Sequence, residues 1–173
     1  MNSTIFTNGL RFLGLLFLQV VVLKSVSIGS EGFKYINILL YPIFILLLPV
    51  RIPHALLVFL GFLLGITLDV FYDSLGVHAG ASVFTAFIRP YVLASLEPRG
   101  GYGVNTSPTK YRFGFNFFLT YACILFFIHL LAYFSLEVFT PVYIGDIFLK
   151  TVFSFLVTIV FVIMYQFLFN PRD

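Results

Sequence analysis

The stretch from Ala55 to Tyr72 reads ALLVFLGFLLGITLDVFY, and Asp69 is its one charged residue. A helix needs about 20 mostly apolar residues to cross the roughly 30 Å hydrocarbon core of a bilayer, because each residue advances it by about 1.5 Å. The apolar residues are continuous rather than alternating, which favours a helix over a strand of a transmembrane barrel. This stretch therefore predicts a membrane-spanning helix.

The composition of the whole chain agrees with that interpretation. Of its 173 residues, 60% are hydrophobic and only 10% are charged, and the mean hydropathy is +1.04. A soluble domain usually carries about a quarter charged residues. The net charge of +3 comes without a run of basic residues, so it does not indicate binding to nucleic acid. We expect an all-α, polytopic transmembrane bundle that forms a single integral membrane domain over residues 1–173.

The chain contains six apolar blocks that qualify as candidate spans. They cover residues 5–23, 35–50, 55–72, 79–96, 113–134 and 147–169. The second block is the weakest, because it is short and contains Pro42, with Pro49 and Pro53 close behind. Proline removes a backbone donor and clashes with the preceding turn, so a kink or a short tilted helix is expected there. A re-entrant segment is the alternative, and it would invert the topology of everything that follows.

The basic residues divide unequally between the two sides of such a six-helix bundle. One side collects Arg11, Arg51, Arg89, Arg99, Lys110, Arg112 and Arg172. The other side collects Lys24, Lys34 and Lys150. Lys and Arg are enriched in cytoplasmic loops, so this split of seven to three predicts that both termini lie in the cytoplasm, an N-in/C-in topology.

Polar and small residues gather on one side of the third predicted span. Gly61, Gly65, Asp69 and Asp73 recur every four residues, which places them on one helix face. The glycines form a small-xxx-small ridge that lets another helix approach closely. A carboxylate here faces protein or water by default, so Asp69 is interpreted as a polar lock between helices or a partner contact. Two alternatives remain. Asp69 and Asp73 are helix-end acids in the headgroup region, or they form a metal or proton site together with His78.

Three further polar residues within the predicted spans are candidates for specific contacts. Gln19 offers an interhelical hydrogen bond. Arg89 precedes Pro90, and we favour snorkelling of its guanidinium toward the cytoplasm over pairing with a carboxylate. His129 is the histidine expected to be buried, yet no acid or nucleophile accompanies it in the sequence. The candidate helix-interface or partner residues are Gly61, Gly65, Asp69, Asp73, Gly76, Gly80, Gln19 and Arg89.

The pattern around the third span resembles that of the bacterial rod shape-determining MreD family. The pattern is G-x3-G-x2-L-D-x5-L-G-x2-A, occupied here by Gly61, Gly65, Leu68, Asp69, Leu75, Gly76 and Ala79. The Leu-Gln pair that ends at Gln19, the proline-ended second block (ILLLPVR), the overall length and the six-span layout also fit. The resemblance covers nearly the whole chain, and its specific part is about twenty residues.

This resemblance implies a scaffold without a reaction of its own, located in the bacterial cytoplasmic (inner) membrane. Such a scaffold belongs to the cell-elongation machinery, which organises peptidoglycan synthesis for cell shape. Its implied partners are an MreC-like bitopic protein and, through the complex, an MreB-type filament, RodA and a penicillin-binding transpeptidase. No cofactor, metal or catalytic residue is implied.

Two other classes of membrane protein are alternatives. The first is the substrate-binding membrane subunit of a vitamin or small-molecule importer, which needs a polar pocket that opens outward. The residues available for such a pocket are Asp69, Asp73, His78 and Asn37. The second is a membrane enzyme, which has little support because the sequence contains no Ser-His-Asp order, HExxH or cysteine motif.

Overall fold

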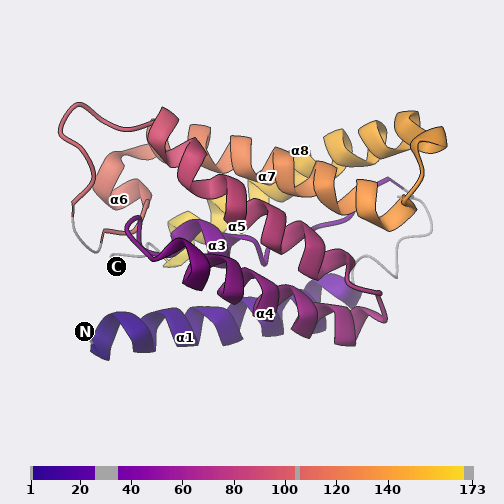
Figure 1. Ribbon diagram of the computed structural model, residues 1–173, viewed down its shortest axis with the longest axis horizontal. Helices are drawn as coiled ribbons and strands as arrows, with labels where there is room; N and C mark the ends of the chain where they lie inside the picture. Colours follow the sequence, from indigo (N-terminus) through magenta and orange to yellow (C-terminus); the bar gives the residue numbers. More distant parts are fainter. Residues whose placement is uncertain (1, 26–34, 104–105, 170–173) are drawn as a thin grey trace.

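The computed structural model describes residues 2–25, 35–103 and 106–169. Throughout these ranges the secondary structure is helical, with no strand. Long helices run along the long axis of the molecule (Figure 1). They are α1 (Asn2–Phe17), which continues into the π-helical turn η1 (Leu18–Leu23), α4 (His54–Tyr72), α5 (Val77–Ser95), α7 (Phe115–Val138) and α8 (Ile144–Phe169). The predicted all-α class is confirmed.

Within the described ranges, four helical stretches have the length and apolarity of membrane spans. They are Phe6–Leu23, His54–Tyr72, Phe115–Val138 and Ile144–Phe169. Helix α5 has 19 residues, as α4 does, but it carries buried polar side chains that include His78 and Arg89. A helix packed inside a bundle tolerates such residues, because they face protein and not lipid.

The ends of α4 follow from its sequence. Pro53 precedes the helix in an extended conformation, which leaves the first helical turn to begin at His54. Asp73 adopts a left-handed conformation, with φ of 51°, and ends the helix after Tyr72. Gly76 is also left-handed, with φ of 83°, and α5 begins immediately after it. The two helices therefore form an antiparallel pair joined by a tight turn.

The second predicted span is not a continuous helix. It contains only α3 (Ile43–Leu47), and the chain on either side of α3 is non-helical. Every residue from Ile38 to Leu48, Pro42 included, is buried. The segment passes through the middle of the bundle (Figure 1). Its proline-rich sequence cannot support a full span, so the backbone must find other hydrogen-bond partners.

Both ends of the helical bundle carry charge. Helix α1 begins and α8 ends at the same end of the molecule, beside the short helix α6 (Lys110–Phe113) (Figure 1). At this end Lys110 Nζ lies 3.4 Å from the ring centroid of Phe167. At the opposite end, Lys150 pairs with Glu137 at 3.0 Å, beside the turn η2 (Pro141–Tyr143). Lys34 and Arg172, which the topology prediction counted, lie outside the described residues.

The loop after α5 folds back on that helix. The Tyr102 hydroxyl donates to the Leu93 carbonyl oxygen at 2.7 Å, and Val50 N donates to Thr106 O at 2.9 Å. Burial, with a smaller contribution from Glu97, raises the pKa of Tyr102 to about 12. Tyr102 therefore stays neutral at physiological pH and holds the loop against the end of α5.

Candidate functional site

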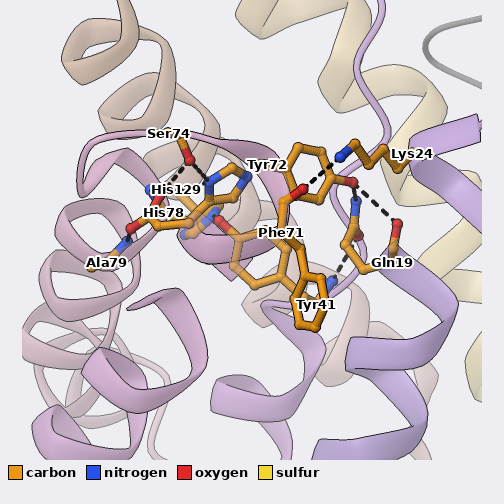
Figure 2. Close-up of polar contacts among 10 residues, drawn as sticks. Gln19, Lys24, Tyr41, Phe71, Tyr72, Ser74, His78, Ala79 and His129 are labelled. Atoms are coloured by element: carbon orange, nitrogen blue, oxygen red, sulfur yellow. Dashed lines mark hydrogen bonds and ion pairs between the residues drawn. The ribbon is translucent and has the colours of Figure 1, made fainter. Parts of the chain in front are cut away.

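Asp69 caps the start of the next helix. Its Oδ1 accepts hydrogen bonds from Ser74 Oγ at 2.6 Å and from His78 N at 2.9 Å, and its Oδ2 accepts from Ala79 N at 2.9 Å. Figure 2 shows these donors converging on one point. The first amides of a helix have no partner within it, and the helix dipole favours negative charge there. Asp69 thus locks α4 to α5 inside the chain.

Two glycines make this lock possible by bringing the helices together. A Cβ on Gly65 would lie 2.5 Å from His78 O and 2.6 Å from Ala79 N, which are backbone atoms that cannot move aside. A Cβ on Gly61 would lie 3.1 Å from Ala86 Cβ. The helix that approaches the predicted glycine ridge is therefore α5 of the same chain, and both glycines are buried.

The spacing of four predicted that Asp73 lies on this helix face, and the structure contradicts that prediction. Helix α4 ends at Tyr72, and the left-handed turn at Asp73 leaves its side chain exposed. Gly76 lies in the same turn, half-buried. Gly80 faces α7 instead, because a Cβ there would lie 2.8 Å from Leu136 Cδ1. The predicted set of residues therefore divides among three different surroundings.

His78 is held by Asp69 and surrounded by tyrosines. Its Nδ1 lies 3.0 Å from Asp69 Oδ1 and 2.9 Å from Ser74 Oγ. Its ring contacts those of Tyr41, Tyr72 and Tyr133, with centroids 5.7, 4.8 and 5.0 Å away. His78 is 0% exposed, and its Nε2 has no hydrogen-bond partner within the described ranges. Such a buried, unpaired nitrogen is uncommon and calls for an explanation.

Gln19 binds the non-helical backbone of the second apolar block. Its Oε1 accepts from Leu40 N at 2.8 Å and Tyr41 N at 3.3 Å. Its Nε2 donates to Ile38 O at 3.0 Å and to the Tyr72 hydroxyl at 3.1 Å. One amide side chain thereby satisfies three backbone groups and also connects α1 to α4 (Figure 2). It lies in the π-helical turn, a distortion that often occurs at functional positions.

Arg89 binds the other end of the second apolar block. The prediction that its guanidinium snorkels toward water is wrong. Arg89 is 0% exposed. Its Nε donates to the Tyr121 hydroxyl at 2.9 Å, and its Nη2 donates to the carbonyl oxygens of Leu48 and, at 3.3 Å, Leu46. Its Nη1 lies 3.4 Å from Pro49 O. These carbonyls end α3, where the partial negative charge of a helix favours a cation.

His129 belongs to a buried chain of hydrogen bonds that the sequence did not reveal. Its Nδ1 lies 2.8 Å from Thr85 Oγ1, and its Nε2 lies 2.8 Å from the Tyr41 hydroxyl. Because Thr85 donates its proton to Ala81 O, it accepts from Nδ1–H, and Nε2 accepts from Tyr41. The three side chains come from three separate segments, so no local spacing could have linked them.

A polar pocket of about 380 Å³ lies at the end of the bundle where α4 and α5 meet. It is lined by Lys24, Asn37, Tyr72, Ser74, Val77, His78, Tyr133 and Glu137. Of the residues proposed for an outward pocket, it contains His78 and Asn37. The described ranges contain no cluster of three metal-binding side chains. Glu137 and Tyr133 were missed because their position one turn apart on α7 carries no motif.

A second hollow is apolar and opens to the side of the bundle. It has a volume of about 770 Å³ and lies between α1, the end of α3 and α4. Phe6, Gly9, Leu13, Leu56 and Leu60 are among the residues that line it. A Cβ on Gly9 would meet nothing within 4 Å, so the backbone of α1 is open to close approach there.

Comparison of the chain with models of protein families, with curated proteins and with solved structures gives no match.

Proposed function

We propose that this chain is a non-catalytic membrane scaffold of the MreD kind. It would span the bacterial inner membrane with five long helices and the buried segment containing α3, with both termini in the cytoplasm. One observation carries the proposal: Gln19, Asp69 and Arg89 each form hydrogen bonds with the chain's own backbone. These polar residues within the spans therefore stabilise the fold of the bundle, as expected of a scaffold.

The charge of the two ends supports the orientation. Arg51, Arg99 and Lys110 lie beyond the same ends of the helices as the start of α1, and excess basic residues favour the cytoplasmic side. The opposite end carries Asp73 and Glu137 beside its lysines.

The apolar groove between α1 and α4 supports a partner with a single membrane helix. Helices in a bilayer associate through close packing and small residues, because lipid offers no hydrophobic driving force between them. An MreC-like bitopic protein presents one such helix. Through it, the chain would connect to the MreB-type filament, RodA and a penicillin-binding transpeptidase of the cell-elongation complex.

The test is purification of the tagged chain from its native membrane in mild detergent. An MreC-like bitopic protein should be recovered with it, and recovery of ATPase subunits in its place would contradict the scaffold. The variant Gly9→Leu fills the groove and should reduce recovery of the partner. Gly145→Leu is the matched control, because a Cβ at Gly145 also meets nothing within 4 Å but lies outside the groove.

The polar pocket favours a second candidate, the substrate-binding membrane subunit of an importer. Its lining residues include two charged side chains and a buried histidine, which suits recognition of a small polar molecule. Co-purification with ATPase subunits, together with ATP-dependent uptake of a small molecule, would establish this candidate over the scaffold.

A further inference from the structure

The polar pocket contains an acceptor for which the described residues supply no donor. Ser74 donates its proton to Asp69 Oδ1, and the carboxylate also faces His78 Nδ1, so Nδ1 carries the proton of the neutral ring. Nε2 is then unprotonated, and its lone pair can accept a hydrogen bond. Among the described residues nothing donates to it, although the histidine is fully buried and lines the pocket. A ligand that fills this need must present an N–H or O–H group.

The pocket wall is charged with opposite signs on two different helices. On the α1 side, Lys24 Nζ donates to Phe71 O at 2.5 Å and lies 5.2 Å from the Tyr72 ring centroid. Within the described ranges one of its three N–H groups is used in a hydrogen bond, and an ammonium has two more to donate to an anionic group. On the α7 side, Glu137 Oε2 binds Lys150 at 3.0 Å. A carboxylate accepts several hydrogen bonds, so Glu137 can take a second cation.

The surroundings of His78 suit the positive end of a ligand. The rings of Tyr72 and Tyr133 both pack against the imidazole, with centroids 4.8 and 5.0 Å away, and aromatic rings attract cations. Asp69, whose Oδ1 lies 3.0 Å from Nδ1 of this ring, adds negative charge. Figure 2 shows the His78 ring between Ser74 and Tyr72, with Lys24 beyond Tyr72. A molecule that extends from His78 toward Lys24 therefore passes from negative to positive surroundings.

We propose that this pocket binds a small zwitterion of the amino-acid class. The ligand's ammonium group donates to His78 Nε2 and to Glu137, and its carboxylate accepts from Lys24 and from the Asn37 side chain. The pocket's volume of about 380 Å³ is at the low end for ligand sites, which limits the ligand to a small molecule. This inference goes beyond the scaffold role and does not require a partner protein.

The experiment uses the full chain in nanodiscs of phosphatidylethanolamine and phosphatidylglycerol. Glycine, β-alanine, 4-aminobutyrate, 6-aminohexanoate and the natural α-amino acids are titrated by calorimetry. Butylamine and butyrate serve as analogues of 4-aminobutyrate with one charge each. We expect saturable binding of at least one zwitterion at millimolar concentration or below, and at least tenfold weaker binding of the analogues with one charge. Absence of saturable binding by every zwitterion would overturn the proposal.

Variants of the charged lining residues locate the site. Lys24→Met and Glu137→Gln change side chains at the accessible edge of the pocket, and each should weaken zwitterion binding at least fivefold. Asp73→Asn removes an exposed acid at the same end of the bundle but outside the pocket, so it should leave binding unchanged. Equal affinity in all three variants would contradict the assignment.

A spectrum of the ¹⁵N-labelled histidines provides a readout that stability changes do not imitate. The ligand should shift the Nε2 signal of His78 and leave those of His54 and His129 in place. A shift confined to the other two histidines, or none, would count against the site. Because partner recovery tests the scaffold separately, failure here leaves that proposal untouched.

Discussion

Replacing Arg89 with methionine tests whether the buried guanidinium supports the non-helical segment. Methionine keeps the apolar stem and removes every donor. Leu46 O would retain the Tyr121 hydroxyl at 3.1 Å, whereas Leu48 O and Pro49 O would lose the donor that Arg89 supplies. These carbonyls belong to the backbone, so no neighbouring substitution can remove them.

The magnitude follows from the number of acceptors left without a donor. A buried acceptor that loses its donor costs about 1–3 kcal/mol. Pro49 is only half-buried, so its carbonyl contributes at the lower end of that range. Removing the buried charge offsets part of this loss of stability, because desolvating a guanidinium is unfavourable. The two acceptors together account for about 2–4 kcal/mol, and after this offset the net expectation for Arg89→Met is a loss of about 1–3 kcal/mol in the free energy of unfolding.

The assay is reversible unfolding in mixed detergent micelles, with Arg51→Met as the matched control. Arg51 is exposed and lies just past the same segment, so the identical change there should cost less than about 0.5 kcal/mol. Hydrogen exchange should also rise over Leu40–Arg51 in Arg89→Met more than over α7. Equal or greater stability of Arg89→Met would refute the reasoning, because it would mean that the carbonyls need no donor.

The remaining predictions use the same unfolding assay, each with a paired control. Gln19→Leu should cost about 2–4 kcal/mol because three backbone groups lose their partner, whereas Gln166→Leu should be neutral or stabilising, since neither amide atom of buried Gln166 has a partner among the described residues. A large loss in both glutamine variants would point to packing instead of hydrogen bonds. Asp69→Asn should cost about 2 kcal/mol by turning one acceptor at the start of α5 into a donor, while Asp73→Asn should change stability by less than about 0.5 kcal/mol. Matching effects of the two acid variants would argue against the cap. Gly65→Ala should destabilise the bundle, because the added Cβ meets backbone atoms, and Gly14→Ala on the open face of α1 should be neutral or stabilising by up to about 1 kcal/mol. Tolerance of alanine at Gly65 would mean that α4 and α5 are farther apart than the structure has them.

The continuous apolar blocks predicted the long helices, because a membrane span is defined by length and hydrophobicity alone. The position of α4 agreed closely: the prediction was 55–72, and the helix in the structure is His54–Tyr72. The second apolar block has the same composition but folds differently, since Pro42 and Pro49 limit the helix between them to α3. Composition could not reveal that Gln19 and Arg89 replace its missing helical hydrogen bonds.

The candidate site was predictable only where its residues share one helix. The spacing of Gly61, Gly65 and Asp69 indicated a common face, and the structure places all three against α5. The same spacing failed at Asp73, because the helix ends one residue earlier. The pocket combines residues from four separate segments, including Lys24 and Glu137, and such a meeting depends on tertiary packing that no spacing encodes.

The central claim is that residues 35–53 pass through the bundle from one end to the other, with their backbone bound by Gln19 and Arg89. Single cysteines in a Cys123→Ala background test it by labelling of sealed cells with a membrane-impermeant maleimide. Ser25→Cys lies before this segment and Arg51→Cys near its end, and Leu75→Cys and Gly100→Cys are exposed references at each end. We expect Ser25→Cys and Leu75→Cys to react in intact cells, whereas Arg51→Cys and Gly100→Cys should react only after permeabilisation. Labelling of Ser25→Cys and Arg51→Cys from the same side would contradict it.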